Sequence, residues 1–377
     1  MPRPAFPRTV LEFQKRFAAE EACLEYLIAS RWSEGFVCPR CGSTDAWWKA
    51  SRRLFECKAC RYQASVTAGT VMHRSRMPLR LWFWAAYLVT THTPGLSARQ
   101  FARQLDLHYE TAFQMLHKLR AAMVREGRER LRGTVEVDEA YIGGARSGKG
   151  GRGAYGKVLV AGAVEVRGQK MGRIRLGVVR GASADQLVGF VKAMVEEGST
   201  VVTDAWKGYA SLGRGGYQHE AQLEGTPERA PEILPHIHLI FSNLKTWLLG
   251  THHGSVRKQH LQAYLNEFTF RFNRRVVPMA AFQTVLGLIG ERQGPTYAGL
   301  YGVAKGSDAW RHPNPTCRPV VCVGDNPIRR TNHFGRWLVG CRDSICSMLH
   351  SNTGSSSQSA HNMSAARRPD FFLGFWF

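Results

Sequence analysis

Two aspartates lie in short runs of β-forming residues, where carboxylates are uncommon. Asp138 follows the run TVEV, and Asp204 follows the run TVVT directly before a stretch that favours a helix. A buried strand rarely contains aspartate, and a single one at a strand end usually caps a turn. Two such carboxylates on one sheet could instead hold two divalent ions about 4 Å apart, as phosphodiester transfer requires. Because hard oxygen ligands suit Mg²⁺, we expect Mg²⁺ or Mn²⁺ as the active-site ion.

Four cysteines form two CxxC pairs, Cys38 with Cys41 and Cys57 with Cys60, and 15 residues separate the pairs. This spacing matches a structural zinc ribbon, in which four thiolates close a tetrahedral Zn²⁺ shell. Such a metal folds the module and performs no chemistry. The residues between the pairs could contact DNA or form the small core of the module. They are basic and aromatic: Trp47, Trp48, Lys49, Arg52, Arg53 and Phe55.

The elements that must position these groups follow from apolar periodicity. Strands are predicted over residues 134–142, 158–166, 174–179 and 200–203, with a helix over 184–197 and a second helical region over 237–274. Three strands, a helix and a strand in this order favour an α/β catalytic core of RNase H-like type over residues 130–292. Before this core we expect a helical lead-in (1–35), the zinc ribbon (36–68) and a helix-turn-helix-like region (78–126). Residues 293–377 lack periodicity, and we expect an irregular, poorly ordered tail.

Residues 96–123 favour two helices joined by a tight turn. Ser97 can cap the first helix, and the second is predicted over residues 109–120. A helical hairpin that binds no DNA would carry the same pattern. If the pair is a DNA-binding motif, the outward side chains of its second helix reach the groove or the phosphates. These are Glu110, Gln114, His117, Lys118 and Arg120.

The charge balance of the chain indicates a polyanionic partner. Lys and Arg number 51 against 29 Asp and Glu, a formal net charge of +22 that is spread along most of the chain. Nucleic acid is the commonest partner of such a protein. The sequence contains no apolar run of about 18 residues, and its N-terminal residues lack the apolar stretch of a signal peptide. We therefore expect a cytoplasmic, nucleoid-associated protein without a membrane partner, whose nine cysteines are thiols or metal ligands.

Four strings occur in order along the chain: VDEAYIGG, TDAWKGY, FSNLKTWLLGTHHG and HLQAYLNEFTFRFNRR. Over residues 10–292 the sequence resembles the DDE-superfamily transposases of bacterial insertion sequences, in particular the ISXO-type group with an N-terminal zinc ribbon. The resemblance implies that Asp138 and Asp204 hold the metal ions. It also implies cleavage of double-stranded DNA at the inverted-repeat ends of the element, and attack of the exposed 3′-hydroxyl on target DNA. Such enzymes assemble on paired ends, so a homo-oligomer is expected.

The resemblance also implies a third carboxylate on a helix some 35 residues after Asp204, but this helix contains no acid. His238 fits the spacing, since it stands 34 residues after Asp204. Asn243, with Lys245 after it, fits a variant of the group in which asparagine replaces glutamate. Either neutral side chain could orient a metal-bound water, and Lys245 could contact phosphate. Without the resemblance, a packing histidine and a surface amide are the ordinary interpretations.

Nearby acids and bases could complete the site. Glu136 and Glu139 could each substitute for the missing acid, and alternation along the strand places Glu136 on the face of Asp138 and turns Glu139 away. The glycine-rich segment 143–157 suits phosphate backbone and lacks the spacing of a nucleotide-binding loop. Residues 271–275 (RFNRR), with Lys258 and His260 on the same helix, form either a DNA-backbone face or a solvated one.

The tail contains Cys317, Cys322, Cys341 and Cys346 in two CxxxxC pairs, a spacing that favours free thiols over zinc. Two other classes of protein fit the same residues. The missing third carboxylate fits a DNA-binding regulator with a decayed catalytic core. An RNase H-like nuclease or resolvase would cut nucleic acid without joining strands.

Overall fold

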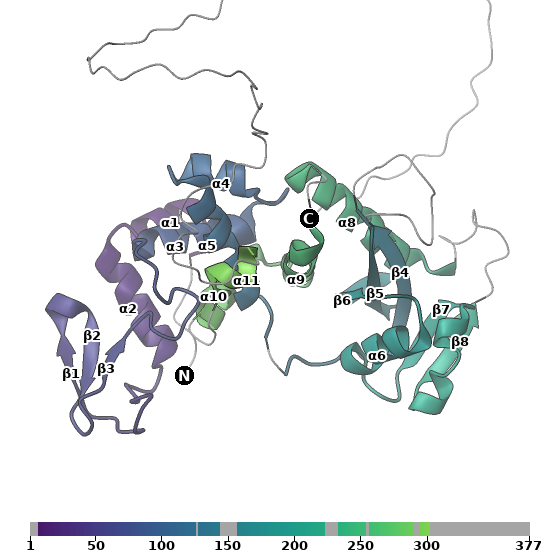
Figure 1. Ribbon diagram of the computed structural model, residues 1–377, viewed down its shortest axis with the longest axis horizontal. Coiled ribbons are helices and arrows are strands. Elements are labelled where there is room, and N and C mark those ends of the chain that lie inside the picture. Colours follow the sequence, from purple (N-terminus) through teal and green to yellow (C-terminus); the bar gives the residue numbers. More distant parts are fainter. Residues whose placement is uncertain are drawn as a thin grey trace, which may run out of the picture. The chain divides into compact units, whose positions relative to one another are not determined.

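The computed structural model describes residues 7–125, 127–143, 157–222, 233–253, 256–289 and 294–301 (Figure 1). A mixed sheet of five strands occupies the second half of this part of the chain. The strands are β4 (Thr134–Ile142), β5 (Val158–Arg167), β6 (Lys170–Val179), β7 (Thr200–Asp204) and β8 (Gln218–Gln222). Their spatial order is β6-β5-β4-β7-β8. The β5 strand runs antiparallel to its neighbours β4 and β6, whereas β7 runs parallel to both β4 and β8.

Most strands begin and end close to the predicted residues. The bounds of β4 are those predicted, β5 and β7 each extend one residue further, and β6 begins four residues earlier at Lys170. The sequence analysis did not predict β8, whose residues QHEAQ are polar and largely exposed. An edge strand with no apolar face gives no period-two signal, so only its pairing with β7 reveals it.

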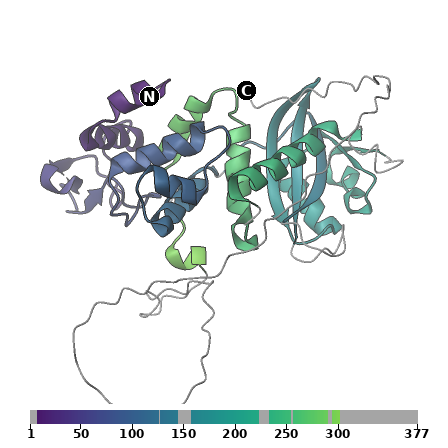
Figure 2. The same cartoon turned by 90° about the horizontal axis from the view of Figure 1, so that it is seen from above.

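Helices cover both faces of this sheet (Figures 1 and 2). On one face, α6 (Ala184–Met194) packs Leu187 and Val191 into a core with Val135 and Val137 of β4. On the other face lie α8 (Pro235–His252) and α9 (Lys258–Phe272), whose apolar residues share a core with Val202, Ile174, and Ala140 and Ile142 of β4. Because side chains alternate along a strand, the even-numbered positions of β4 point towards α8.

The first half of the chain forms a helical unit together with a later segment. Its helices are α1 (Val10–Arg16), α2 (Glu20–Arg31), α3 (Leu79–Thr91), α4 (Ala98–Gln104), α5 (Tyr109–Ala122) and α10 (Pro278–Ile289). Phe13, Phe83 and Phe282 meet in their common core. Within the region predicted as one domain, residues 130–292, the last helix α10 packs against α3 of this helical unit. A short apolar helix indicates burial, but its sequence does not specify its partner.

The zinc ribbon consists of three short antiparallel strands, β1 (Ala46–Lys49), β2 (Leu54–Cys57) and β3 (Gln63–Ser65). A small cluster of Phe36, Cys38, Cys57 and Ala64 fills its interior. Such a cluster is too small to hold a module together alone, so a metal site is expected to supply much of its stability.

Part of the predicted irregular tail is helical, since α11 (Tyr297–Tyr301) follows α10 and buries Leu300. Residues 302–377, with the four tail cysteines, lie outside the described residues, and so do residues 144–156 of the glycine-rich segment. Among the helices that the structure describes, none is long and apolar enough to span a membrane.

Candidate active site and zinc centre

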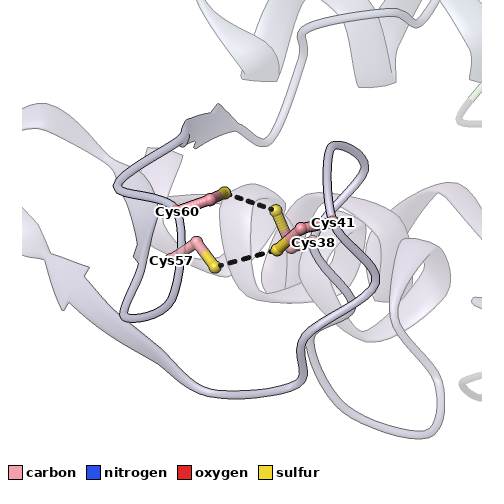
Figure 3. A group of neighbouring side chains, drawn as sticks. All are labelled: Cys38, Cys41, Cys57 and Cys60. Atoms are coloured by element: carbon pink, nitrogen blue, oxygen red, sulfur yellow. Dashed lines mark hydrogen bonds between the residues drawn. The ribbon is translucent and has the colours of Figure 1, made fainter.

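The four ribbon cysteines converge on one point (Figure 3). Cys38 Sγ lies 3.7 Å from Cys60 Sγ, Cys41 Sγ lies 3.6 Å from Cys57 Sγ, and all four sulfur atoms lie within 4.8 Å of one another. A tetrahedral Zn²⁺ with Zn–S bonds of about 2.3 Å requires sulfur separations of about 3.8 Å. The donor set therefore fits zinc, as predicted. Within the described residues, this is also the only group of three or more metal-binding side chains with such geometry.

Two matching turns hold these thiols. The residue after each CxxC pair has a left-handed backbone, Gly42 with φ +73° and Arg61 with φ +56°. Their N–H groups donate to the carbonyl oxygens of Cys38 and Cys57. The N–H of Cys60 is the main cause that lowers the pKa of the Cys57 thiol to about 6. A lowered pKa favours the thiolate, the form that binds zinc.

The ribbon aromatics divide between its core and its surface. Phe55 stacks on Phe36 at 4.9 Å inside the module. Trp47 is 40% exposed, and the charged groups of Arg61, Lys49 and Lys58 lie 4.7, 5.5 and 5.9 Å from its ring centroid. The surface around Trp47 is thus both aromatic and cationic, a combination that suits contact with nucleic acid.

Asp138 and Asp204 lie level with each other on adjacent parallel strands. The last register pair of β4 and β7 is Glu136 with Val202, and each aspartate stands two residues beyond it. Val202 belongs to the core beneath α8, so alternation turns both carboxylates to the α8 face. Both side chains are half-buried. The two aspartates thus come to one edge of the sheet, on one face, as two hard oxygen donors that suit Mg²⁺.

The third-position candidates occupy different flanks of α8. His238, in its first turn, places Nε2 3.9 Å from Oδ2 of Asp138. At about 100° per residue, Asn243 lies about 140° around the helix from His238, whereas Lys245 returns to within about 20° of it. Lys245 is exposed and Asn243 is half-buried. The structure therefore brings His238 to Asp138, while Asn243 lies on another flank of α8 and Lys245 shares the His238 flank about 10 Å further along the axis.

Glu136 is engaged by the helix backbone. Its Oε2 accepts from the N–H groups of His236 at 3.0 Å and Ile237 at 2.9 Å, and its Oε1 lies 2.6 Å from His236 Nδ1. The carboxylate lies on the face of Asp138, as predicted. Both of its oxygens are hydrogen-bonded to the start of α8, and its use as a substitute for the missing third acid stays a prediction.

Glu139 faces away from Glu136, as alternation predicts, and meets a tyrosine that sequence reasoning missed. Tyr209 is fully buried, and its Oη donates to Oε2 of Glu139 at 2.8 Å. Burial, followed by the negative charges of Glu139, Asp138 and Asp204, raises the pKa of Tyr209 well above its usual value. The phenol thus stays neutral and ties Glu139 to the segment after β7. Only its place five residues after Asp204 could have signalled it.

The helix-turn-helix prediction holds for the elements and fails for part of the outward face. Ser97 Oγ accepts from Gln100 N at 3.2 Å as the cap of α4, and α5 begins at Tyr109. His117 and Arg120, however, are buried at 3% and 1% exposure. Arg120 Nε donates to Oε2 of the buried Glu267 on α9 at 2.7 Å. The expectation that these two side chains contact DNA is wrong, because α9 packs on this half of α5.

The other three expected contact residues, Lys118, Glu110 and Gln114, are half-buried and bonded to neighbouring segments. Lys118 Nζ donates to the carbonyl oxygen of His73 at 3.1 Å. At the start of α5, Tyr297 of α11 is hydrogen-bonded to Glu110, and Tyr301 is hydrogen-bonded to Gln114. The side of α5 that was predicted to contact DNA is thus largely covered by α9 and α11. Beside it, an open hollow of about 380 Å³ is lined by Arg99, Ala102, Arg103, Asp106, Leu107 and Tyr109.

The predicted basic face of α9 is also mostly internal. His260 and Arg271 are buried, and Arg271 donates to the carbonyl oxygens of His92 and Thr93. Arg275 lies over the Phe272 ring at 4.2 Å and donates to the Met171 carbonyl oxygen. His260 and Arg271 are therefore internal and do not form the predicted DNA-backbone face, whereas Arg275 is half-buried. Lys258 remains exposed.

Two family models match this chain. Residues 130–273 match the ISXO2-like transposase domain, and residues 18–63 match the transposase zinc-ribbon domain. A protein of Halobacterium salinarum, described as an uncharacterized protein in transposable element ISH50, is 27% identical over 278 residues. That alignment covers 68% of this chain and 92% of the relative. The two matching domains, together with a relative from a transposable element, identify an insertion-sequence transposase. The chain thus contains the transposase domain and the zinc ribbon of ISXO2-like transposases.

Proposed function

We propose that this transposase binds the terminal inverted repeats of its insertion sequence and catalyses metal-dependent DNA cleavage and strand transfer. The observation that carries the proposal is the position of Asp138 and Asp204, level on the adjacent parallel strands β4 and β7 and facing α8. The strand order β6-β5-β4-β7-β8, with one antiparallel and one parallel half, supports an RNase H-like core. In such a core, two carboxylates at this place hold divalent ions for phosphodiester chemistry.

Each residue of the site would have a distinct part. Asp138 and Asp204 would hold Mg²⁺ or Mn²⁺, which activates the attacking water or 3′-hydroxyl and stabilises the leaving oxygen. His238 would take the third position, because its Nε2 is the candidate group that lies beside Asp138. A neutral imidazole there can orient a water or hydroxyl without adding negative charge. Lys245, on the same flank of α8, would contact a DNA phosphate as a point charge.

DNA binding would use the surfaces that remain open. The ring of Trp47 with Arg61, Lys49 and Lys58 supports contact between the ribbon and DNA. Arg99 and Arg103 on α4 line the open hollow beside α5 and would contact phosphates there. Assembly on two element ends, and hence a homo-oligomer, follows from the strand-transfer reaction that we propose.

Incubating the full chain with labelled element ends, target DNA and Mg²⁺ or Mn²⁺ tests the proposal. Cleavage followed by joined products is the expected result. Binding without cleavage would identify a regulator with a decayed core, and cleavage without joining would identify a nuclease or resolvase. His238→Ala and Asn243→Ala, compared under the same conditions, test the third position. We expect the larger loss of strand transfer in His238→Ala, and a larger loss in Asn243→Ala would reassign that position.

A further inference from the structure

We propose that Glu136 is a positioning residue that fixes the first turn of α8 to β4 and so holds His238 opposite Asp138. The proposal rests on the proposed function for its catalytic consequence. Its structural basis is the bonding of one buried carboxylate, which connects two elements about 100 residues apart in the sequence. Glu136 lies two residues before Asp138. The N–H groups that donate to it belong to His236 and Ile237, the two residues before His238.

The start of α8 has no cap of its own. Its N-cap residue is Leu234, which makes no side-chain capping bond, and Pro235 begins the helix without an N–H group. The first turn of a helix leaves N–H groups without partners in the helix itself. Here the two such groups, those of His236 and Ile237, both donate to Oε2 of Glu136. A carboxylate at this end also interacts favourably with the helix dipole.

The geometry limits where His238 can lie. Oε1 of Glu136 meets His236 Nδ1 at 2.6 Å, so the carboxylate is bonded along both of its edges. With His236 and Ile237 fixed to β4, the next residue of the helix is His238, whose Nε2 lies 3.9 Å from Asp138. Glu136 itself does not need to touch a metal or DNA for this effect, because it acts through the helix.

A glycine on the neighbouring strand supports the same close approach. Gly162 of β5 is the register partner of Asp138. A Cβ atom at Gly162 would lie 2.8 Å from Phe241 Cζ and 2.9 Å from Ile237 Cδ1, both on α8. The missing side chain leaves the space that these α8 side chains fill. Gly162→Ala should therefore shift the first turn of α8 without removing a polar group.

Activity assays separate positioning from general stability. The substrate is a duplex of the terminal inverted repeat with an exposed 3′-hydroxyl, at saturating DNA and Mg²⁺. Glu136→Ala should lower the strand-transfer rate by about 10- to 100-fold with unchanged affinity for the duplex, as loss of an outer residue of a metal site does. Glu136→Gln should stay close to wild type, because its amide oxygen still accepts both N–H groups. Equal losses in both variants would overturn the proposal.

Glu165 provides the matched control. It is a buried acid on β5 whose carboxylate accepts hydrogen bonds from Arg173. Glu165→Gln should lower the unfolding temperature and leave the strand-transfer rate unchanged. If both glutamate positions reduce the rate equally at equal loss of stability, Glu136 is only a structural residue.

A double-mutant cycle tests whether Glu136 acts through His238. In a His238→Ala background, Glu136→Ala should cause little further loss, since the residue that it positions is already absent. A full and independent loss in that background would contradict the proposal. Gly162→Ala should behave like Glu136→Ala, with a reduced rate in the wild-type background and little effect without His238.

Hydrogen exchange gives a readout without catalysis. In the metal-free full chain, the N–H groups of His236 and Ile237 should exchange faster in Glu136→Ala than in wild type or Glu136→Gln. Unchanged exchange in Glu136→Ala would refute the tether, whatever the enzyme does. Conversely, a wild-type chain that neither cleaves nor joins element ends would refute the proposed function and leave this exchange experiment intact.

Discussion

Replacing Glu267 by glutamine should destabilise the protein more than any change to a surface ion pair. This carboxylate is fully buried between two cations: Arg120 Nε lies 2.7 Å from its Oε2, and Arg271 Nη1 lies 3.5 Å from its Oε1. Arg120 is 1% exposed and Arg271 is 7% exposed. Glu267→Gln keeps the shape of the side chain and removes the charge that both cations share.

The size of the effect follows from the burial. Removing one partner of a buried ion pair costs about 3–5 kcal/mol, since the other charge stays desolvated. Two arginines depend on Glu267, so we expect the upper part of that range. Arg120→Met should cost less, because Glu267 then keeps Arg271. The matched surface change is Glu56→Gln, whose partner Arg61 is 67% exposed, and it should cost less than about 1 kcal/mol.

Thermal unfolding of the full chain, followed by circular dichroism, measures this order. Glu267→Gln should lower the unfolding temperature by roughly 10 °C, by more than Arg120→Met and much more than Glu56→Gln. If Glu267→Gln and Glu56→Gln lower the unfolding temperature equally, the Glu267 carboxylate is hydrated in solution. The packing of α9 on α5 that we describe would then be wrong.

Three further results are expected. Burial raises the pKa of Glu165, but hydrogen bonds from the Arg173 side chain and from the backbone N–H groups of Arg173 and Arg132 outweigh it and lower the folded pKa from 4.5 to about 2. The stability that this carboxylate contributes is therefore complete above pH 4.5 and is lost as pH falls towards 2. Glu165→Gln should flatten this pH dependence of unfolding, and an unchanged acid transition would contradict the assignment. Gly95→Ala should lower the free energy of unfolding by about 2 kcal/mol or more, because φ is +85° and the new Cβ would lie 2.5 Å from Trp247 Nε1. Gly127→Ala, where φ is +61° and nothing lies near the new Cβ, should lower it less, and equal unfolding temperatures for the two variants would refute the contact at Gly95. Truncation after residue 293 removes α11 from α5 and should tighten binding to element ends; unchanged affinity would exclude α5 from the DNA interface.

The sequence predicted those features whose signals are local. The β-forming runs around Asp138 and Asp204 placed β4 and β7 to within a residue, and Ser97 marked the start of α4. The spacing of the CxxC pairs predicted the convergence of the cysteines, because two tight turns can close only a small shell. Each of these features depends on a few neighbouring residues.

Features that depend on distant partners could not be predicted in this way. The outward pattern of α5 is the same whether solvent or α9 covers it, so the burial of Arg120 required knowledge of Glu267, 147 residues later. The face of the sheet on which Glu136 lies was predicted correctly, but its hydrogen bonds to the start of α8 were not. Those bonds arise because α8 has no side-chain cap of its own, and the helix lies about 100 residues further along the sequence. For the third position, residue spacing favoured His238 and the resemblance favoured Asn243. The rotation of α8 places His238 beside Asp138.

Strand transfer by the aspartate variants tests the central claim most directly. A pre-cleaved element end, target DNA and Mg²⁺ are incubated with wild type, Asp138→Asn and Asp204→Asn, and the joined product is measured beside DNA binding. Wild type should form joined product. Each variant should form none and bind the end with unchanged affinity, because asparagine keeps the shape and removes the charged metal ligand. Joined product at the wild-type rate in either variant would contradict the assignment of Asp138 and Asp204 as the metal-binding pair.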